Sequence, residues 1–295
     1  MSLYPPVAMA QASTLLVSAT LFTIMFALGL GLPGDGLRVV RQRWGLVLRV
    51  LVGSCLLVPL AALLLLKLPV SVALSPAARL AIGLMAVCPS APLILRKAGN
   101  QGGDRQLAAL LQGCAAVAAI VSVPLMADLY SSAFGLSGWD VGPAEVALQV
   151  GRVQILPLLA GLALRRWEPQ LVGRIQGPLD RLANGLLLLL IVLVLIKTGP
   201  LLLPFVGREL LALALMAVMV LVALAIGLLL AGPQPRERTT VALVTSMRNP
   251  GLALLLATTY APSQPSVKIA VLAYLLVTVL LSLPVLRWQQ GQGAA

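Results

Sequence analysis

Histidine is absent from this chain of 295 residues. The absence excludes metal sites built on imidazole, a Ser-His-Asp triad and histidine proton relays. Cysteine is rare, and Cys55, Cys88 and Cys114 lie in apolar runs without C-x-x-C spacing, so neither a zinc site nor a disulfide framework is predicted. The nine acidic residues form no catalytic pair. We therefore predict a protein that is not an enzyme and that holds no metal or cofactor.

Charged residues are also few, at 10% of the chain, whereas soluble domains contain about 25%. Hydrophobic residues make up 60%, and the mean hydropathy is +1.01. One membrane-spanning helix needs about 20 mostly apolar residues, so the composition predicts an integral membrane protein with many spans in the lipid bilayer. Disorder, a coiled coil, a disulfide-rich secreted domain and a soluble α/β enzyme are excluded.

Nine apolar runs are predicted to be all-α membrane spans, since each is too long for a barrel strand and lacks strict alternation. The longest polar stretches, 133–145 and 166–180, leave no room for a large soluble domain. The predicted spans, numbered here in chain order, are 13–32, 45–68, 78–95, 105–130, 146–165, 181–204, 209–231, 239–260 and 266–287.

The net charge of +12 comes from basic residues that gather in alternate loops, as at Arg38, Arg41, Arg165 and Arg166. The positive-inside rule explains this pattern, so nucleic acid is not a predicted partner. The rule predicts an N-terminus outside and a C-terminus in the cytosol, and the lack of a transit peptide favours a plasma (inner) membrane. No basic residue precedes Arg38, so the first run is predicted to be a retained helix and not a signal peptide.

The third span contains Cys88-Pro89-Ser90-Ala91-Pro92. Two prolines remove two backbone donors and clash with preceding carbonyl groups, so the helix is expected to kink or unwind inside the membrane. Freed backbone groups are tolerated there only when they are buried in protein or line a wet cavity. A harmless proline kink is the alternative reading.

The eighth span breaks in a similar way at Pro250-Gly251, after four polar residues. One of them is Arg248, and an arginine near the bilayer centre costs at least about 2.5 kcal/mol on insertion scales. It must face a cavity, a partner or a ligand, unless it snorkels to the cytosolic surface. The polar residues before this break are Thr245, Ser246, Arg248 and Asn249.

The two broken spans lie five apart and have opposite predicted orientations, which is typical of a transporter built from inverted repeats. The first repeat is predicted to cover about 13–130 with four helices, and the second about 146–287 with five. Residues 1–295 then form a single transporter unit.

Three segments resemble motifs of the bile acid:sodium symporter family. Residues 22–32, followed by Asp35, Arg38 and Arg41, look like the family's early MFxMGL helix and its basic loop. The Cys-Pro-Ser-Ala-Pro segment falls at the family's first crossing motif, Cys-Pro-Gly-Gly, and 247–253 fall at the second, Met-Gln-Asn-Ser-Gly-Leu-Ala. The resemblance implies a panel of spans 1, 5 and 6 and a core of the other six, with spans 3 and 8 crossing. It also implies transport of organic anions, usually by symport with sodium.

The departures from the family pattern concern the residues that bind sodium. Sodium prefers several oxygen ligands, usually with a carboxylate, so we predict that both sodium sites are absent. The departures are Val244 in place of Glu, Arg248 and Ser54 in place of Gln, and Ile94, Leu95, Gln112 and Ala116 near the Ser, Asn and hydroxyl ligands.

The predicted function is a secondary transporter of a small organic anion that does not depend on sodium. Arg248 could replace the fixed charge of sodium or hold the anion directly by bidentate hydrogen bonds. The sequence predicts neither the substrate nor the oligomeric state. The predicted substrate-binding residues are Ser54, Ser90, Thr245, Ser246, Arg248 and Asn249, and the helix-breaking residues are Pro89, Pro92, Pro250 and Gly251.

Two alternatives stay open at this stage. An arsenite-type efflux permease would use Cys88 in the first crossing span, although such carriers also need a Glu near the second crossing. A non-transporting membrane sensor or interaction protein of the same fold would explain the lost ion ligands, but the chain has no soluble output domain.

Overall fold

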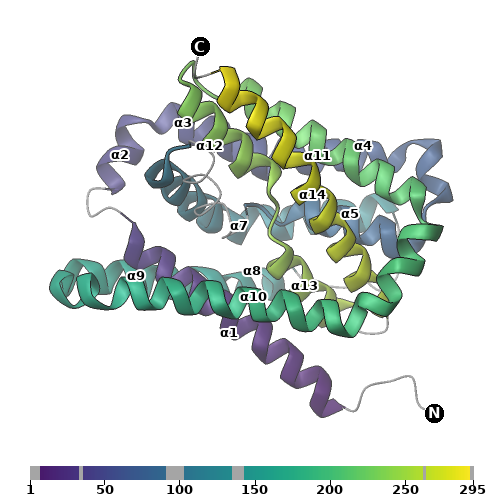
Figure 1. Ribbon diagram of the computed structural model, residues 1–295, viewed down its shortest axis with the longest axis horizontal. Helices are drawn as coiled ribbons and strands as arrows, with labels where there is room; N and C mark the ends of the chain where they lie inside the picture. Colours follow the sequence, from purple (N-terminus) through teal and green to yellow (C-terminus); the bar gives the residue numbers. More distant parts are fainter. Residues whose placement is uncertain (1–6, 33–35, 91–102, 135–142, 262–263, 293–295) are drawn as a thin grey trace.

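The computed structural model describes residues 7–32, 36–90, 103–134, 143–261 and 264–292, and every regular element within these ranges is helical (Figure 1). Two short π-helices, η1 and η3, and one 3-10 helix, η2, interrupt the α-helices. The elements are α1 (Val7–Gly31), α2 (Gly36–Gln42), α3 (Trp44–Val52), η1 (Gly53–Leu57), α4 (Val58–Lys67), η2 (Pro69–Ala73), α5 (Pro76–Val87), α7 (Arg105–Phe134), α8 (Pro143–Val150), η3 (Gly151–Ile155), α9 (Leu156–Trp167), α10 (Pro169–Arg208), α11 (Leu210–Leu230), α12 (Pro235–Ser246), α13 (Pro250–Tyr260) and α14 (Pro265–Gln292).

Seven helical stretches among the described residues are long and apolar enough to cross a membrane. Leu15–Gly31 and Pro76–Val87 are shorter apolar helices. The all-helical membrane architecture is therefore confirmed, whereas the count of nine spans and the inverted repeat stay predictions. The polar stretch 166–180 is helical almost throughout, because it includes the first turns of the 40-residue helix α10. At 1.5 Å per residue α10 is about 60 Å long, which exceeds the hydrocarbon core of about 30 Å.

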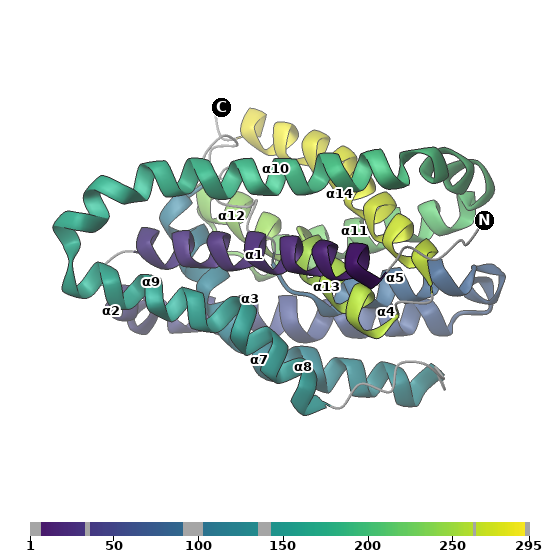
Figure 2. The ribbon, with the colours of Figure 1, turned by 90° about the horizontal axis from the view of Figure 1, so that it is seen from below.

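The helices form two groups. Helix α1 packs mainly against α9 and α10, and Figure 2 shows it lying between these two helices. In Figure 1, α9 and α10 follow the lower side of the molecule, while α3, α4, α11, α12 and α14 lie above them. Within this second group, α11 packs on α12 and α14, and α14 packs on α5. We call α1, α8–α9 and α10 the panel and the other helices the core.

Two glycines allow α1 and α9 to approach each other closely. A Cβ atom on Gly29 would overlap the Leu158 carbonyl oxygen and lie 3.0 Å from the Gly161 Cα atom, and a Cβ on Gly161 would overlap the Phe26 carbonyl oxygen. Small residues at helix contacts in membranes let backbones approach, so that van der Waals packing holds the helices together. The panel therefore depends on the absence of side chains at these two positions.

Replacing Gly29 by alanine is expected to lower the melting temperature of the purified protein, because overpacking against backbone atoms costs about 1–3 kcal/mol. The matched control is Gly185→Ala in α10, where a Cβ would meet nothing within 4 Å. This control should melt as the wild type does or slightly higher. A Gly29→Ala protein as stable as the Gly185→Ala protein would contradict the tight panel contact.

Candidate functional site

The first break follows α5. The helix begins at the N-cap Ser75, whose hydroxyl accepts a hydrogen bond from the Ala78 N–H group at 3.3 Å, and it ends at Val87. The Cys88 N–H group makes the last hydrogen bond of the helix, to the Leu84 carbonyl at 3.0 Å, and Pro89 and Ser90 lie outside helical structure, as the sequence predicts for a proline-broken span. Ser90 is the non-glycine residue with a positive φ in the described chain, at 20°. The second proline of the motif, Pro92, lies outside the described residues.

The second break separates α12 from α13. The backbone is extended at Met247 and Asn249, and Pro250 takes the first position of α13. The Asn249 side chain caps this helix, because its Oδ1 atom accepts a hydrogen bond from the Leu252 N–H group at 3.0 Å. The Asn249 backbone N–H group donates to the Cys88 carbonyl oxygen at 3.3 Å. This bond brings the two breaks, far apart in the sequence, into direct contact.

Arg248 lies at this contact and is only 1% exposed. Its guanidinium group has five N–H donors, and each of five protein acceptors takes a hydrogen bond from it. Nε donates to the Met85 carbonyl at 3.1 Å, and Nη2 donates to the Ala86 carbonyl. Nη1 donates to the Ser54 hydroxyl at 2.9 Å and to the Thr245 carbonyl at 3.3 Å, and Nη2 donates to the Ser54 carbonyl at 2.9 Å.

The π-helix η1 explains why the Ser54 carbonyl can accept from an arginine. In η1 the N–H groups bond five residues back, as from Val58 to the Gly53 carbonyl. The next donor in this pattern would be residue 59, which is a proline and has no N–H group. The Ser54 carbonyl is thereby released, and Arg248 satisfies it. A local irregularity in the helix thus becomes part of the site, as is frequent for π-bulges.

The structure brings Ser54, Thr245, Arg248 and Asn249 together, with Ser90 next to the first break. The Ser246 hydroxyl instead donates to the Ala242 carbonyl at 2.7 Å within α12. Three buried polar atoms in this region have no hydrogen-bond partner among the described residues. They are Ser90 Oγ, Thr245 Oγ1 and Asn249 Nδ2.

The guanidinium has no N–H group left for an anion in this conformation, so direct anion binding by Arg248 stays a prediction. Gly251 is also placed at the site: a Cβ there would lie 2.8 Å from Leu21 Cδ2 of α1. The break therefore touches the panel. Val244, where the resemblance places a carboxylate, is fully buried in an apolar cluster with Leu243 and Met247.

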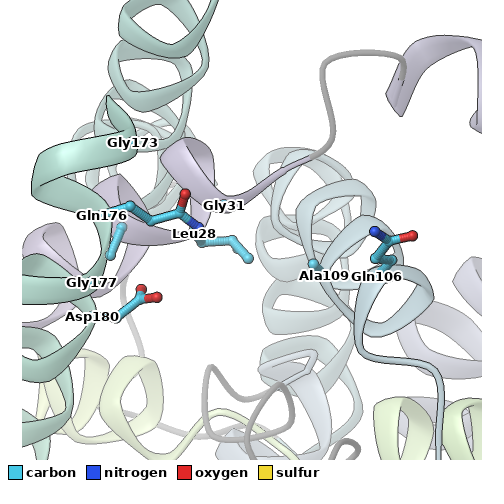
Figure 3. Close-up of a pocket in the computed structure, with 9 residues that line it drawn as sticks. Leu28, Gly31, Gln106, Ala109, Gly173, Gln176, Gly177 and Asp180 are labelled. Atoms are coloured by element: carbon cyan, nitrogen blue, oxygen red, sulfur yellow. The ribbon is translucent and has the colours of Figure 1, made fainter. Parts of the chain in front are cut away.

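A pocket of about 380 Å³, which the sequence did not predict, lies between panel and core (Figure 3). Gln176 and Asp180 of α10 face Ala109 and Gln106 of α7 across it in the figure. The signal in the sequence was the polar stretch 166–180, in which Gln176 and Asp180 are one helical turn apart. The remaining lining residues are Ala27, Leu28, Gly31, Gly173 and Gly177.

Comparison with known proteins agrees with this architecture. The family described as Sodium Bile acid symporter family matches residues 18–203, which is more than half of the chain and includes the first break. No curated protein matches the chain at a significant level. The family's members are membrane transporters, and the described helices are apolar enough for a multi-pass protein in a lipid bilayer. The chain belongs to the sodium bile acid symporter family.

Proposed function

We propose that the protein is a sodium-independent carrier of a small organic anion, in which Arg248 supplies the positive charge that a bound sodium ion supplies in the family. The observation that carries the proposal is the set of five hydrogen bonds from this guanidinium to acceptors on η1, α5 and α12. Four of these acceptors are backbone carbonyl oxygens, the kind of ligand that a hard cation also uses.

A tethered guanidinium differs from a bound ion because it cannot dissociate. Carbonyl oxygens at the C-terminal end of a helix carry partial negative charge. At the end of α5, the Met85 and Ala86 carbonyls accept hydrogen bonds from the positively charged Arg248 side chain. The site therefore keeps its cation in every state of the carrier. A sodium ion would have to compete with an arginine already hydrogen-bonded there, and Val244 offers no carboxylate to bind it.

The anion is expected at the start of α13. The N-terminal end of a helix carries partial positive charge and binds anionic groups, and transporters place such ends of broken helices toward their substrates. Asn249 adds a buried Nδ2 donor at this end, and its amide orientation is fixed by the cap to Leu252. We assign the direct contact with the anion to Asn249 and the long-range attraction to Arg248.

The same proposal includes the placement of the chain in a plasma membrane. Nine spans in a four-plus-five repeat would leave the N-terminus outside and the C-terminus in the cytosol. The exposed arginines Arg38, Arg41, Arg166 and Arg174 would then face the cytosol, as the positive-inside rule requires. The protein would act as a carrier and neither as an enzyme nor as a sensor.

The melting temperature of detergent-purified protein, measured in sodium chloride and in choline chloride at equal ionic strength, tests sodium independence. A ligand that binds only the folded state raises the midpoint in a concentration-dependent way. We expect no sodium-specific rise. A saturable rise in sodium would contradict the proposal, and counterflow of a labelled anion in sodium-free liposomes would separate a carrier from a sensor.

A further inference from the structure

Gln154 lies in the π-helix η3 of the panel and is 2% exposed. Its Nε2 atom is buried and has no hydrogen-bond partner among the described residues. Burying a polar group without a partner costs about 1–3 kcal/mol, so a side chain of this kind is retained for a reason other than stability. The established family membership and the site at the breaks assign no role to Gln154.

The π-helix η3, which carries Gln154, repeats the backbone pattern of η1. In η3 the Leu156 N–H group bonds five residues back to the Gly151 carbonyl. The next donor in the pattern would be Pro157, which has no N–H group, so the carbonyl released in η3 is that of Arg152, two residues before Gln154. At η1 the same combination of π-helix and proline presents Ser54 to Arg248 of the site. The panel therefore contains a second π-helix of the type that frequently marks functional positions.

Contacts along α1 and α9 give the depth of Gln154. The two helices run in the same direction, because Met25 and Leu28 share a cluster with Ile155 and Leu158, and Arg165 Nη1 donates to the Leu30 carbonyl at 2.8 Å further along.

Gly29 of α1 contacts Gly161 of α9. Seven residues before each glycine, Phe22 and Gln154 lie at the same level, and Leu21 directly precedes Phe22 in α1. Leu21 is the α1 residue whose side chain reaches Gly251 at the second break. Gln154 thus lies at the depth of the breaks.

A second contact places this part of the panel beside α13. Gln149 Nε2, just before η3, donates to Thr259 Oγ1 near the end of α13 at 3.1 Å. From that contact the panel chain continues to Gln154, and α13 leads back to its capping residue Asn249. Gln154 and Asn249 therefore belong to two segments that contact each other, one in the panel and one in the core.

We propose that Gln154 is the panel-side binding residue for the substrate and donates through Nε2 to its acid group, opposite Asn249 Nδ2 of the core. The proposal rests on the proposed anion carrier and names its substrate class more closely. Both donors are neutral NH2 groups, so the ligand is a small monoanion whose acceptor oxygens, of a carboxylate or sulfonate, reach both carboxamides. Neutral donors also leave the bonds of Arg248 intact while the anion binds.

Replacing Gln154 by leucine tests the assignment, with pyruvate, methanesulfonate and cholate as probes of three acid classes. Because the change removes a buried NH2 group without a partner among the described residues, we expect the variant to melt at the same temperature as the wild type or higher without a probe. The rise in melting temperature that a probe gives the wild type should be lost. Gln170→Leu, at an exposed position of α10, should keep the full rise. A Gln154→Leu protein that keeps it too would overturn the proposal.

Cysteine labelling separates this proposal from the carrier function itself. If no probe stabilises the wild type, the anion proposal fails for these acid classes, and Gln154 is then judged by accessibility. In a background with Cys55, Cys88 and Cys114 replaced by alanine, Gln154→Cys should react with a polar maleimide in membrane vesicles. Leu159→Cys, at an exposed position on the apolar helix α9, should not react. A Gln154→Cys protein as unreactive as this control would show that position 154 does not line the path.

Discussion

Replacement of Arg248 by methionine is expected to destabilise the protein more than any other single substitution in the chain and to abolish transport. The methionine side chain fills a similar volume but donates no hydrogen bond. It would leave three helix-end carbonyls, of Met85, Ala86 and Thr245, and both Ser54 oxygens without their donor. Each buried acceptor left without its donor costs about 1–3 kcal/mol, so the loss of several at once is expected to total at least about 3–5 kcal/mol.

The measurement is the melting temperature of the purified variant, which is expected to fall by about 6–20 °C, since 1 kcal/mol corresponds to about 2–4 °C in a large domain. Arg248→Lys keeps the charge with three donors in place of five, so its melting temperature should lie between those of the methionine variant and the wild type. Arg174→Met, at an exposed position of α10, is the matched control and should change little. An Arg248→Met protein that melts with the wild type would show that the guanidinium does not hold the crossing together.

The helix breaks could be predicted because their causes are local. Pro89 and Pro250 lack a backbone N–H donor whatever the tertiary structure. The polar residues before Pro250 would be costly to expose to lipid, so they also mark the break. The structure ends α5 at Val87 and α12 at Ser246, one residue before the Cys-Pro pair and four before Pro250. Apolar length and composition were likewise sufficient for an all-helical membrane protein.

The partners of Arg248 could not be predicted in the same way. Snorkelling and a buried role are both compatible with its position ten residues after Arg238, and only tertiary packing excludes the first, since the side chain is 1% exposed. The acceptors come from three segments of the chain, and one of them, the Ser54 carbonyl, is available only because of a π-helix. Periodicity carries no signal for such a one-residue irregularity.

Gln154 was missed for a related reason. A single glutamine in an apolar run is usually satisfied by its own helix or by a neighbour, and the sequence does not say which face of the panel it occupies. Its depth follows from the contact between Gly29 and Gly161, which the sequence does not pair. The pocket near Gln176 depends likewise on how α10 lies against α1 and α7.

The double substitution Val244→Glu with Arg248→Gln is expected to create a sodium response that the wild type lacks. Removing the guanidinium releases the carbonyls of Met85, Ala86 and Ser54, and the new glutamate and glutamine add side-chain oxygens at the positions where the resemblance places the family's ligands. Several oxygens with one carboxylate suit a hard cation. Sodium at ten times its Kd would add about 1.4 kcal/mol to the free energy of unfolding.

The measurement is the melting temperature of the double variant in sodium chloride and in choline chloride, and we expect a rise of about 3–6 °C specific to sodium. The single variants are the controls. Arg248→Gln alone lacks the carboxylate, and Val244→Glu alone keeps the guanidinium on the carbonyl oxygens that sodium would need, so neither should respond to sodium. A double variant that is folded but indifferent to sodium would mean that Arg248 does not occupy a former cation site. The guanidinium would then be a structural crosslink between the breaks, and sodium independence would need another physical cause.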